Sequence, residues 1–154
     1  MVIVGFGAIF GVLQVISRIF ARFGLQSAQN SVVDIAGQNP TIFLLLVPLS
    51  FILIGPGEEL LYRGLIQGIL RKSFSPVRAI ILASLLFAAI HIFSLQGQLQ
   101  GKLVYLSVVF ALALVLGSLY EYTDNLAVPA LVHGAYNATL FGFQYLIATG
   151  MIPR

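Results

Sequence analysis

Long apolar runs, interrupted by short polar stretches, are the main pattern along this chain. A helix needs about 20 mostly apolar residues to cross the hydrocarbon core of a membrane, and the pattern predicts about five membrane helices. They cover residues 2–20, 41–70, 79–93, 103–120 and 126–147. The third is slightly short unless it begins near Pro76. The sequence therefore predicts an all-α fold, a polytopic transmembrane helical bundle.

The second apolar run is too long for one straight crossing. Gly55-Pro56-Gly57 lies in its middle, and because proline removes a backbone donor and glycine relaxes the backbone, we expect a kink or break there. Residues 25–39 are polar enough for an external loop, which has room for a short interfacial helix. Nothing indicates a second domain or a repeat, so residues 1–154 are expected to form a single membrane-embedded domain.

The composition agrees with a membrane protein and excludes most other classes. Apolar residues make up 59% of the chain and charged residues only 8%, whereas soluble domains have about 25% charged residues. The chain has no cysteine, which excludes a disulfide framework and a thiolate metal site. Its net charge of +3 comes from so few residues that it indicates no nucleic-acid partner. We expect a multi-pass protein of the cell membrane, with membrane lipid around it.

The basic residues bear on orientation. Arg71, Lys72 and Arg78 form the sharpest cluster and lie in one short connection. Positively charged loops are enriched on the cytoplasmic side, so this connection is predicted to be cytoplasmic. Arg18 and Arg22 indicate the opposite orientation if the long second run crosses the membrane only once.

Two pairs of glycines have the spacing that lets helices approach closely in lipid. They are Gly7 with Gly11 and Gly64 with Gly68. We expect both pairs to pack helices within one bundle, and a dimer interface is the alternative.

Six polar residues lie within or at the edges of the apolar runs. They are Glu58, Glu59, Arg63, His91, His133 and Asn137. The set includes both histidines of the chain and two of its five acids. An ionisable residue near the bilayer centre costs roughly 2.5–3.5 kcal/mol on insertion scales and marks a functional site by default. These residues are therefore the candidate site.

Their spacing separates two acids that are adjacent in the chain. Glu59 and Arg63 are four residues apart with the acid first, which is the favoured order for an ion pair within a helix. Glu58 projects about 100° away around the helix and has no cation as a neighbour, which suits a general base. His133 and Asn137 are also four apart, so they share one helix face. Each pair alone has a structural explanation, as an ion pair or as hydrogen bonding between helices.

In order, the candidate residues lie in the segments EELLYR at 58–63, FAAIH at 87–91 and HGAYN at 133–137. This ordered set resembles the EExxxR, FxxxH and HxxxN motifs of the CAAX protease and bacteriocin-processing (CPBP, or Abi) family of intramembrane proteases. The Ras-converting CaaX endopeptidases belong to the same family. We expect residues 41–148 to form a CPBP-like catalytic core. Family members often have further N-terminal spans, and here about one and a half helices precede the first motif.

The resemblance implies hydrolysis of a peptide bond in a membrane-associated or lipidated (CaaX-like) protein or peptide, which includes prenylated substrates. It implies that Glu58 activates water and that His91 positions or polarises this water. His133 and Asn137 match the pair that holds the oxyanion of the tetrahedral intermediate. The remaining acid and the arginine of the first motif, Glu59 and Arg63, support the geometry of the site.

A metal-dependent version of the same protease is the first alternative. Glu58, His91 and His133 would form a plausible zinc shell with an open position for water. The sequence lacks HExxH, in which two histidines share one helix face. We therefore expect a glutamate mechanism without a cofactor, and the zinc-dependent mechanism is the alternative.

Three other classes compete with this interpretation. A serine intramembrane protease needs a serine in a glycine-rich motif, and Gly117-Ser118 is the only approach to one. An ion-coupled carrier would suit acids beside a broken helix at Gly55-Pro56-Gly57, but five spans are few and no repeat is visible. A non-catalytic membrane scaffold derived from such proteases would be separated from an enzyme by a cleavage assay on the Glu58→Gln protein.

Overall fold

The structure, a computed structural model, describes residues 1–153 and is built almost entirely of helices. The α-helices are α1 (Val2–Arg22), α2 (Ser31–Gln38), α3 (Thr41–Leu49), α4 (Gly55–Glu59), α5 (Gly68–Leu70), α6 (Pro76–Ile90), α7 (Leu99–Thr123) and α8 (Ala127–Ala148). Two π-helical segments, η1 (Ser50–Ile54) and η2 (Leu60–Gln67), and a 3₁₀ segment, η3 (His91–Ser94), continue them. Two short strands, β1 (Gln29–Asn30) and β2 (Leu95–Gln96), pair antiparallel.

Four helices are long and apolar enough to cross a membrane, at Val2–Arg22, Thr41–Leu70, Pro76–Ser94 and Leu99–Thr123. The predicted all-α membrane bundle is therefore confirmed. The predicted count of five is not, because α8 is not among the four. This helix is 22 residues long and contains His133, Asn137 and Gln144 among its apolar residues.

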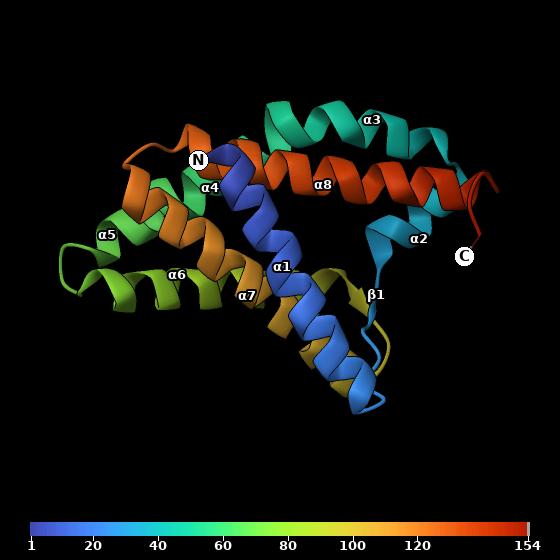
Figure 1. Cartoon of the computed structure of the whole chain (residues 1–154), viewed down its shortest axis with the longest axis horizontal. Helices are drawn as coiled ribbons and strands as arrows, with labels where there is room; N and C mark the ends of the chain where they lie inside the picture. Colours follow the sequence, from blue (N-terminus) through green and yellow to red (C-terminus); the bar gives the residue numbers. More distant parts are fainter. Residues whose placement is uncertain (154) are drawn as a thin grey trace.

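The second span is one continuous helix, so the chain does not break at Gly55-Pro56-Gly57. The backbone N–H of Gly55 donates to the carbonyl of Ser50, a bond that reaches back five residues where an α-helix reaches back four. Pro56 follows at the start of α4. In the middle of a regular α-helix, its missing N–H and its ring would disturb the hydrogen bonding of the preceding turn. Figure 1 shows that α3 and α5, on either side of this point, run in different directions. The change of direction coincides with the π-helical segments and with Pro56, where the kink was expected.

The helices pack in pairs around the middle of the molecule. In Figure 1, α3 and α8 lie side by side along the top of the view and α6 lies along the bottom. Helix α1 crosses diagonally and packs against α7 and α8, and α6 packs against α7. The largest cluster of buried apolar side chains joins α1, α7 and α8 and contains Ile9, Leu112, Leu116 and Val132. Apolar side chains such as Ile3 and Ile52 stay exposed, as expected on a surface that faces lipid.

The second span and α8 cross where two glycines meet. A Cβ atom added to Gly55 would lie 2.8 Å from the carbonyl oxygens of Ala130 and Ser50. A Cβ added to Gly134 would also lie 2.8 Å from the Ser50 oxygen. Only glycine permits this approach, and it places the acids that follow Gly55 beside His133.

The two glycine pairs expected to pack helices do not do so, and this prediction is wrong. A Cβ on Gly7, Gly11 or Gly68 would meet no atom within 4 Å, and a Cβ on Gly64 would meet only side-chain carbons at 3.5 Å or more. A spacing of four residues places two glycines on one face of a helix, but it does not say whether that face is buried.

The polar segment at 25–39 contains the expected short helix, α2. Asn30 caps its N-terminus, because the Asn30 side-chain oxygen accepts a hydrogen bond of 2.9 Å from the N–H of Val32. Through the pairing of β1 with β2, this segment is joined to the loop that follows His91. The polar segment is thereby held beside the turn that carries His91.

Candidate active site

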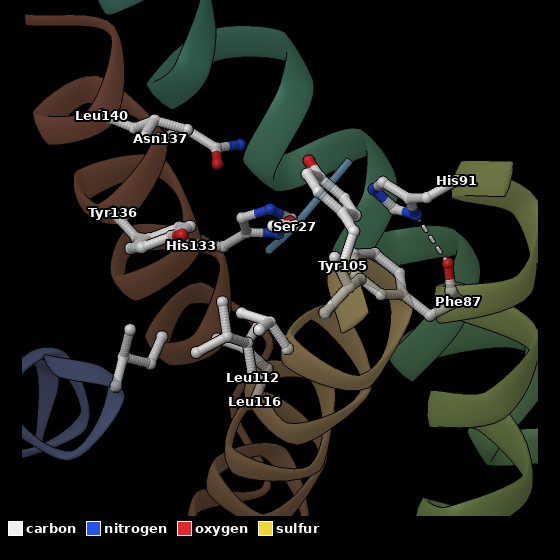
Figure 2. A pocket seen from close by; sticks show the side chains of 13 residues that line it. Ser27, Phe87, His91, Tyr105, Leu112, Leu116, His133, Tyr136, Asn137 and Leu140 are labelled. Atoms are coloured by element: carbon white, nitrogen blue, oxygen red, sulfur yellow. Dashed lines mark hydrogen bonds between the residues drawn. The ribbon is translucent and has the colours of Figure 1, made fainter. Parts of the chain in front are cut away.

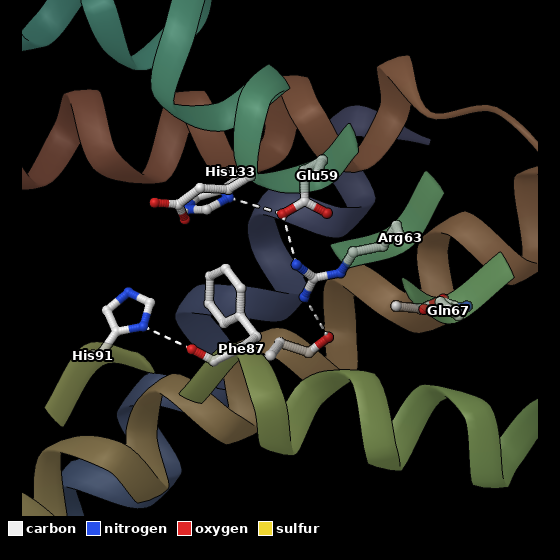
Figure 3. A network of polar contacts seen from close by, with 9 residues as sticks. Glu59, Arg63, Gln67, Phe87, His91 and His133 are labelled. Atoms are coloured by element: carbon white, nitrogen blue, oxygen red, sulfur yellow. Dashed lines mark hydrogen bonds and ion pairs between the residues drawn. The ribbon is translucent and has the colours of Figure 1, made fainter. Parts of the chain in front are cut away.

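Glu59 and Arg63 form the predicted ion pair. Arg63 Nη1 lies 2.9 Å from Glu59 Oε1, and the side chains are 1% and 0% exposed. Arg63 Nη2 donates to the carbonyl of Ala113 on α7 at 3.0 Å, and the guanidinium lies 4.7 Å from the centre of the Phe87 ring. Arg63 thus connects the second span to α6 and α7 (Figure 3).

His133 is held by the same carboxylate, a contact that the sequence analysis missed. His133 Nδ1 donates a hydrogen bond of 2.8 Å to Glu59 Oε1, which Figure 3 shows beside the bond from Arg63. The other ring nitrogen, Nε2, lies 3.8 Å from Glu58 Oε2. The imidazole therefore lies between the two adjacent acids, and Glu59 fixes its orientation.

Glu58 differs from Glu59 in its surroundings. Its side chain is 36% exposed, whereas that of Glu59 is fully buried. No Lys or Arg forms an ion pair with Glu58 within residues 1–153. The basic side chain beside it is the imidazole of His133. This carboxylate has the accessibility that a water-activating group needs.

His91 lies where α6 passes into η3. Its Nδ1 donates to the carbonyl of Phe87 at 2.8 Å (Figure 2). This bond places the proton of the neutral ring on Nδ1, so Nε2 is left as a hydrogen-bond acceptor. The Phe87 ring lies between the two histidines, with its centre 4.9 Å from that of His91 and 5.8 Å from that of His133.

A cavity of about 320 Å³ brings together three of the four residues expected to be catalytic. Its lining residues are Ile9, Ser27, Phe87, His91, Tyr105, Val108, Val109, Leu112, Leu116, His133, Tyr136, Asn137 and Leu140. His91, His133 and Asn137 enter it from two different helices (Figure 2). Glu58 is not in the lining and is next to it through His133. Most of the wall is aliphatic or aromatic, so water in the cavity has few polar partners.

The lining also includes hydroxyl groups that the sequence analysis did not consider. Tyr105 on α7, Tyr136 on α8 and Ser27 in the polar segment all face the cavity. Tyrosines inside an apolar run resemble ordinary packing residues. The one available signal was the position of Tyr136 inside the third motif.

The predicted zinc ligands are not arranged as a metal site. Among residues 1–153, no group of three His, Cys, Asp or Glu side chains is placed so that it could hold a metal ion. Glu58 and His133 approach each other, but the Nδ1 of His91 is bound to a backbone carbonyl. The donor set in this arrangement does not fit zinc. Zinc dependence stays a prediction for experiment.

Comparison with protein families identifies the chain. Residues 40–139 match the family described as type II CAAX prenyl endopeptidase Rce1-like. The match covers about two thirds of the 154 residues and includes all three motifs. The chain belongs to this family. The resemblance to CAAX proteases is thereby confirmed, while comparisons with curated proteins and with solved structures give no match.

Membership of the Rce1-like family supports protease activity at the level of the family. Together with the four long apolar helices, it identifies a multi-pass membrane protein. The histidines and acids of the candidate site therefore belong to a chain of an endopeptidase family.

Proposed function

We propose that the chain is an intramembrane endopeptidase that hydrolyses a peptide bond of a membrane-associated or lipidated, CaaX-like protein or peptide. The observation that carries this proposal is the His133 ring, which lies between Glu58 and Glu59 and opens onto the cavity shared with His91 and Asn137. The family match supports the reaction class.

Glu58 is the general base. Its partly exposed carboxylate takes a proton from a water molecule while the water oxygen attacks the carbonyl carbon of the substrate. The free Nε2 of His91 accepts a hydrogen bond from the same water and orients it. When the intermediate collapses, the carbon–nitrogen bond breaks and the proton on Glu58 passes to the leaving amine.

His133 and Asn137 stabilise the oxyanion. Asn137 donates from its neutral amide, and His133 donates from Nε2. Since His133 Nδ1 already donates to Glu59, donation from Nε2 requires the doubly protonated ring, with its charge between the two carboxylates. Donors aimed at developing charge in a site that excludes water usually make the largest contribution to catalysis.

The test is cleavage of a farnesylated peptide with a CaaX ending by purified protein in liposomes. The Glu58→Gln protein should fold and bind the peptide but not cleave it, because glutamine keeps the shape of glutamate and cannot accept the proton. Asp34→Asn, the same acid-to-amide change in α2, is the matched control and should cleave normally. Full activity of the Glu58→Gln protein would exclude this mechanism.

Zinc dependence is tested on the same preparation. The glutamate mechanism predicts unchanged cleavage after exhaustive chelation. Stoichiometric zinc, with activity lost on chelation and restored by added zinc, would instead support the zinc-dependent version with Glu58, His91 and His133 as ligands.

A further inference from the structure

Asn30 connects the polar N-terminal segment to the wall of the cavity. Its side-chain oxygen accepts from the N–H of Val32. Because a backbone N–H is always a donor, this bond fixes which end of the amide is nitrogen. That nitrogen, Nδ2, donates to the hydroxyl of Tyr105 at 3.1 Å and to the hydroxyl of Ser94 at 3.4 Å.

The hydroxyl of Tyr105 is therefore an acceptor toward Asn30, and its own O–H is available. Within residues 1–153, the Tyr105 O–H donates to no protein group. Tyr105 lines the cavity together with His91, His133 and Asn137, and Figure 2 shows its hydroxyl projecting among them. The Tyr105 side chain is only partly buried and its hydroxyl faces the cavity, so a molecule in the cavity can accept this hydrogen bond.

Asn30 also sets the position of Tyr105 relative to η3, the turn that begins with His91. Ser94, its second partner, donates to the carbonyl of His91 at 2.9 Å. One side chain thus links a hydroxyl on α7 to the segment that carries His91. The pairing of β1 with β2 reinforces the same junction through the backbone.

We propose that Tyr105 is a further substrate-binding residue, whose O–H donates to a backbone carbonyl of the bound peptide, and that Asn30 is the residue that positions it. This inference rests on the proposed function. Tyr105 belongs to α7, whereas His133 and Asn137 belong to α8. In an extended peptide, successive carbonyls point to opposite sides. If His133 and Asn137 on α8 hold the carbonyl oxygen of the bond to be cleaved, the next carbonyl of the peptide points away from α8. The Tyr105 hydroxyl on α7 is placed to donate to that carbonyl.

The experiment measures binding apart from chemistry. A fluorescent peptide with a farnesylated CaaX ending is titrated onto the Glu58→Gln protein, with and without Tyr105→Phe. Loss of one hydrogen bond between neutral groups should weaken binding about 2- to 12-fold. In the otherwise unchanged enzyme, Tyr105→Phe should raise KM by a similar factor and leave kcat unchanged. Tyr122→Phe, on the exposed part of the same helix, is the matched control.

Asn30→Asp provides a second variant. Aspartate keeps the oxygen that caps α2, but it has no N–H to give to Tyr105, and its carboxylate accepts the Tyr105 O–H. The same weakening of binding is expected with an unchanged melting temperature. Combining Asn30→Asp with Tyr105→Phe should add nothing further.

The outcomes are distinct. Binding by the Tyr105→Phe protein equal to that of the control would overturn the inference and leave the proposed function intact. A fall in kcat with unchanged binding would also overturn it, because the hydroxyl would then act on the oxyanion. If the unchanged enzyme neither bound nor cleaved the peptide, the proposed function would fail for this substrate class, and the role of Tyr105 with it.

Discussion

Glu58 and Glu59 are adjacent in the chain, yet their carboxylates have different environments. Glu59 Oε1 receives hydrogen bonds from Arg63 and His133, and Glu59 Oε2 has no partner among the described residues. Glu58 is open enough to meet water. Because consecutive helix residues project about 100° apart, one acid is directed into the protein while the other stays at the edge of the cavity.

Arg63→Ala should destabilise the protein and abolish activity. It leaves the buried Glu59 carboxylate without its cation, which costs about 3–5 kcal/mol. Denaturant unfolding and peptide cleavage would be measured together, with Arg71→Ala as the control because Arg71 pairs with Glu121 at a partly exposed site. Unchanged stability and activity of the Arg63→Ala protein would contradict the supporting role.

Asn137→Ala should leave the fold intact and reduce kcat by about 10²- to 10³-fold, since one oxyanion donor is lost while the base remains. The measurement is single-turnover cleavage. Asn125→Ala, in the exposed turn before α8, is the control. A change confined to KM would place Asn137 in substrate binding instead.

At the scale of the helix, the second span presents one polar face to α7 and α8. Glu59, Arg63 and Gln67 are four residues apart and all are at most 1% exposed. Gln67 donates to the carbonyl of Gly117 at 3.2 Å, one turn along from the Ala113 carbonyl that Arg63 contacts. In an α-helix each step of four residues rotates the side chain by about 40°. The wider π turns of η2 offset this rotation and keep the face aligned.

Gly134→Ala should separate the second span from α8. Its Cβ would lie 2.8 Å from the backbone oxygen of Ser50, and overpacking of this kind costs about 1–3 kcal/mol. The rate of peptide cleavage should fall strongly while the free energy of unfolding changes only by this amount, because His133 moves with α8 away from Glu59. Gly142→Ala on the same helix, where a Cβ would meet nothing within 4 Å, should keep both properties.

At the scale of the whole molecule, the sequence predicted what local patterns encode. Apolar runs predicted the four helices that are long and apolar enough to cross a membrane, together with a fifth that is not among them, and charges inside those runs indicated the candidate site. The bonds from His133 to Glu59 and from Asn30 to Tyr105 join residues 74 and 75 positions apart. No local pattern specifies such pairs, because they depend on how the helices cross. For the same reason, the role of Gly55 and Gly134 in the close crossing of the two helices was not predicted.

The basic connection between α5 and α6 should lie in the cytoplasm. The chain has no cysteine, so single cysteines can be introduced directly. Ser73→Cys should react with an impermeant thiol reagent only from the cytoplasmic side, and Gln98→Cys, beyond the next span, only from the opposite side. The reverse labelling pattern would invert the predicted orientation.

The π turn at Ser50–Ile54 determines where the second span can lose a residue. A π-helical turn holds one residue more than the α-helix around it would need. Deleting a single codon in this stretch would let the helix close as an ordinary α-helix, still apolar and still long enough to insert. Because the π turn takes up its extra residue within about one turn, the deletion would leave the side chains after it on nearly the same faces relative to α3, and both acids would stay beside His133. A deletion within α3 itself, between Thr41 and Leu49, removes a residue that the regular helix needs and would turn α3 by about 100° relative to the segments after it. The second span should therefore tolerate a missing residue only where it already holds one too many.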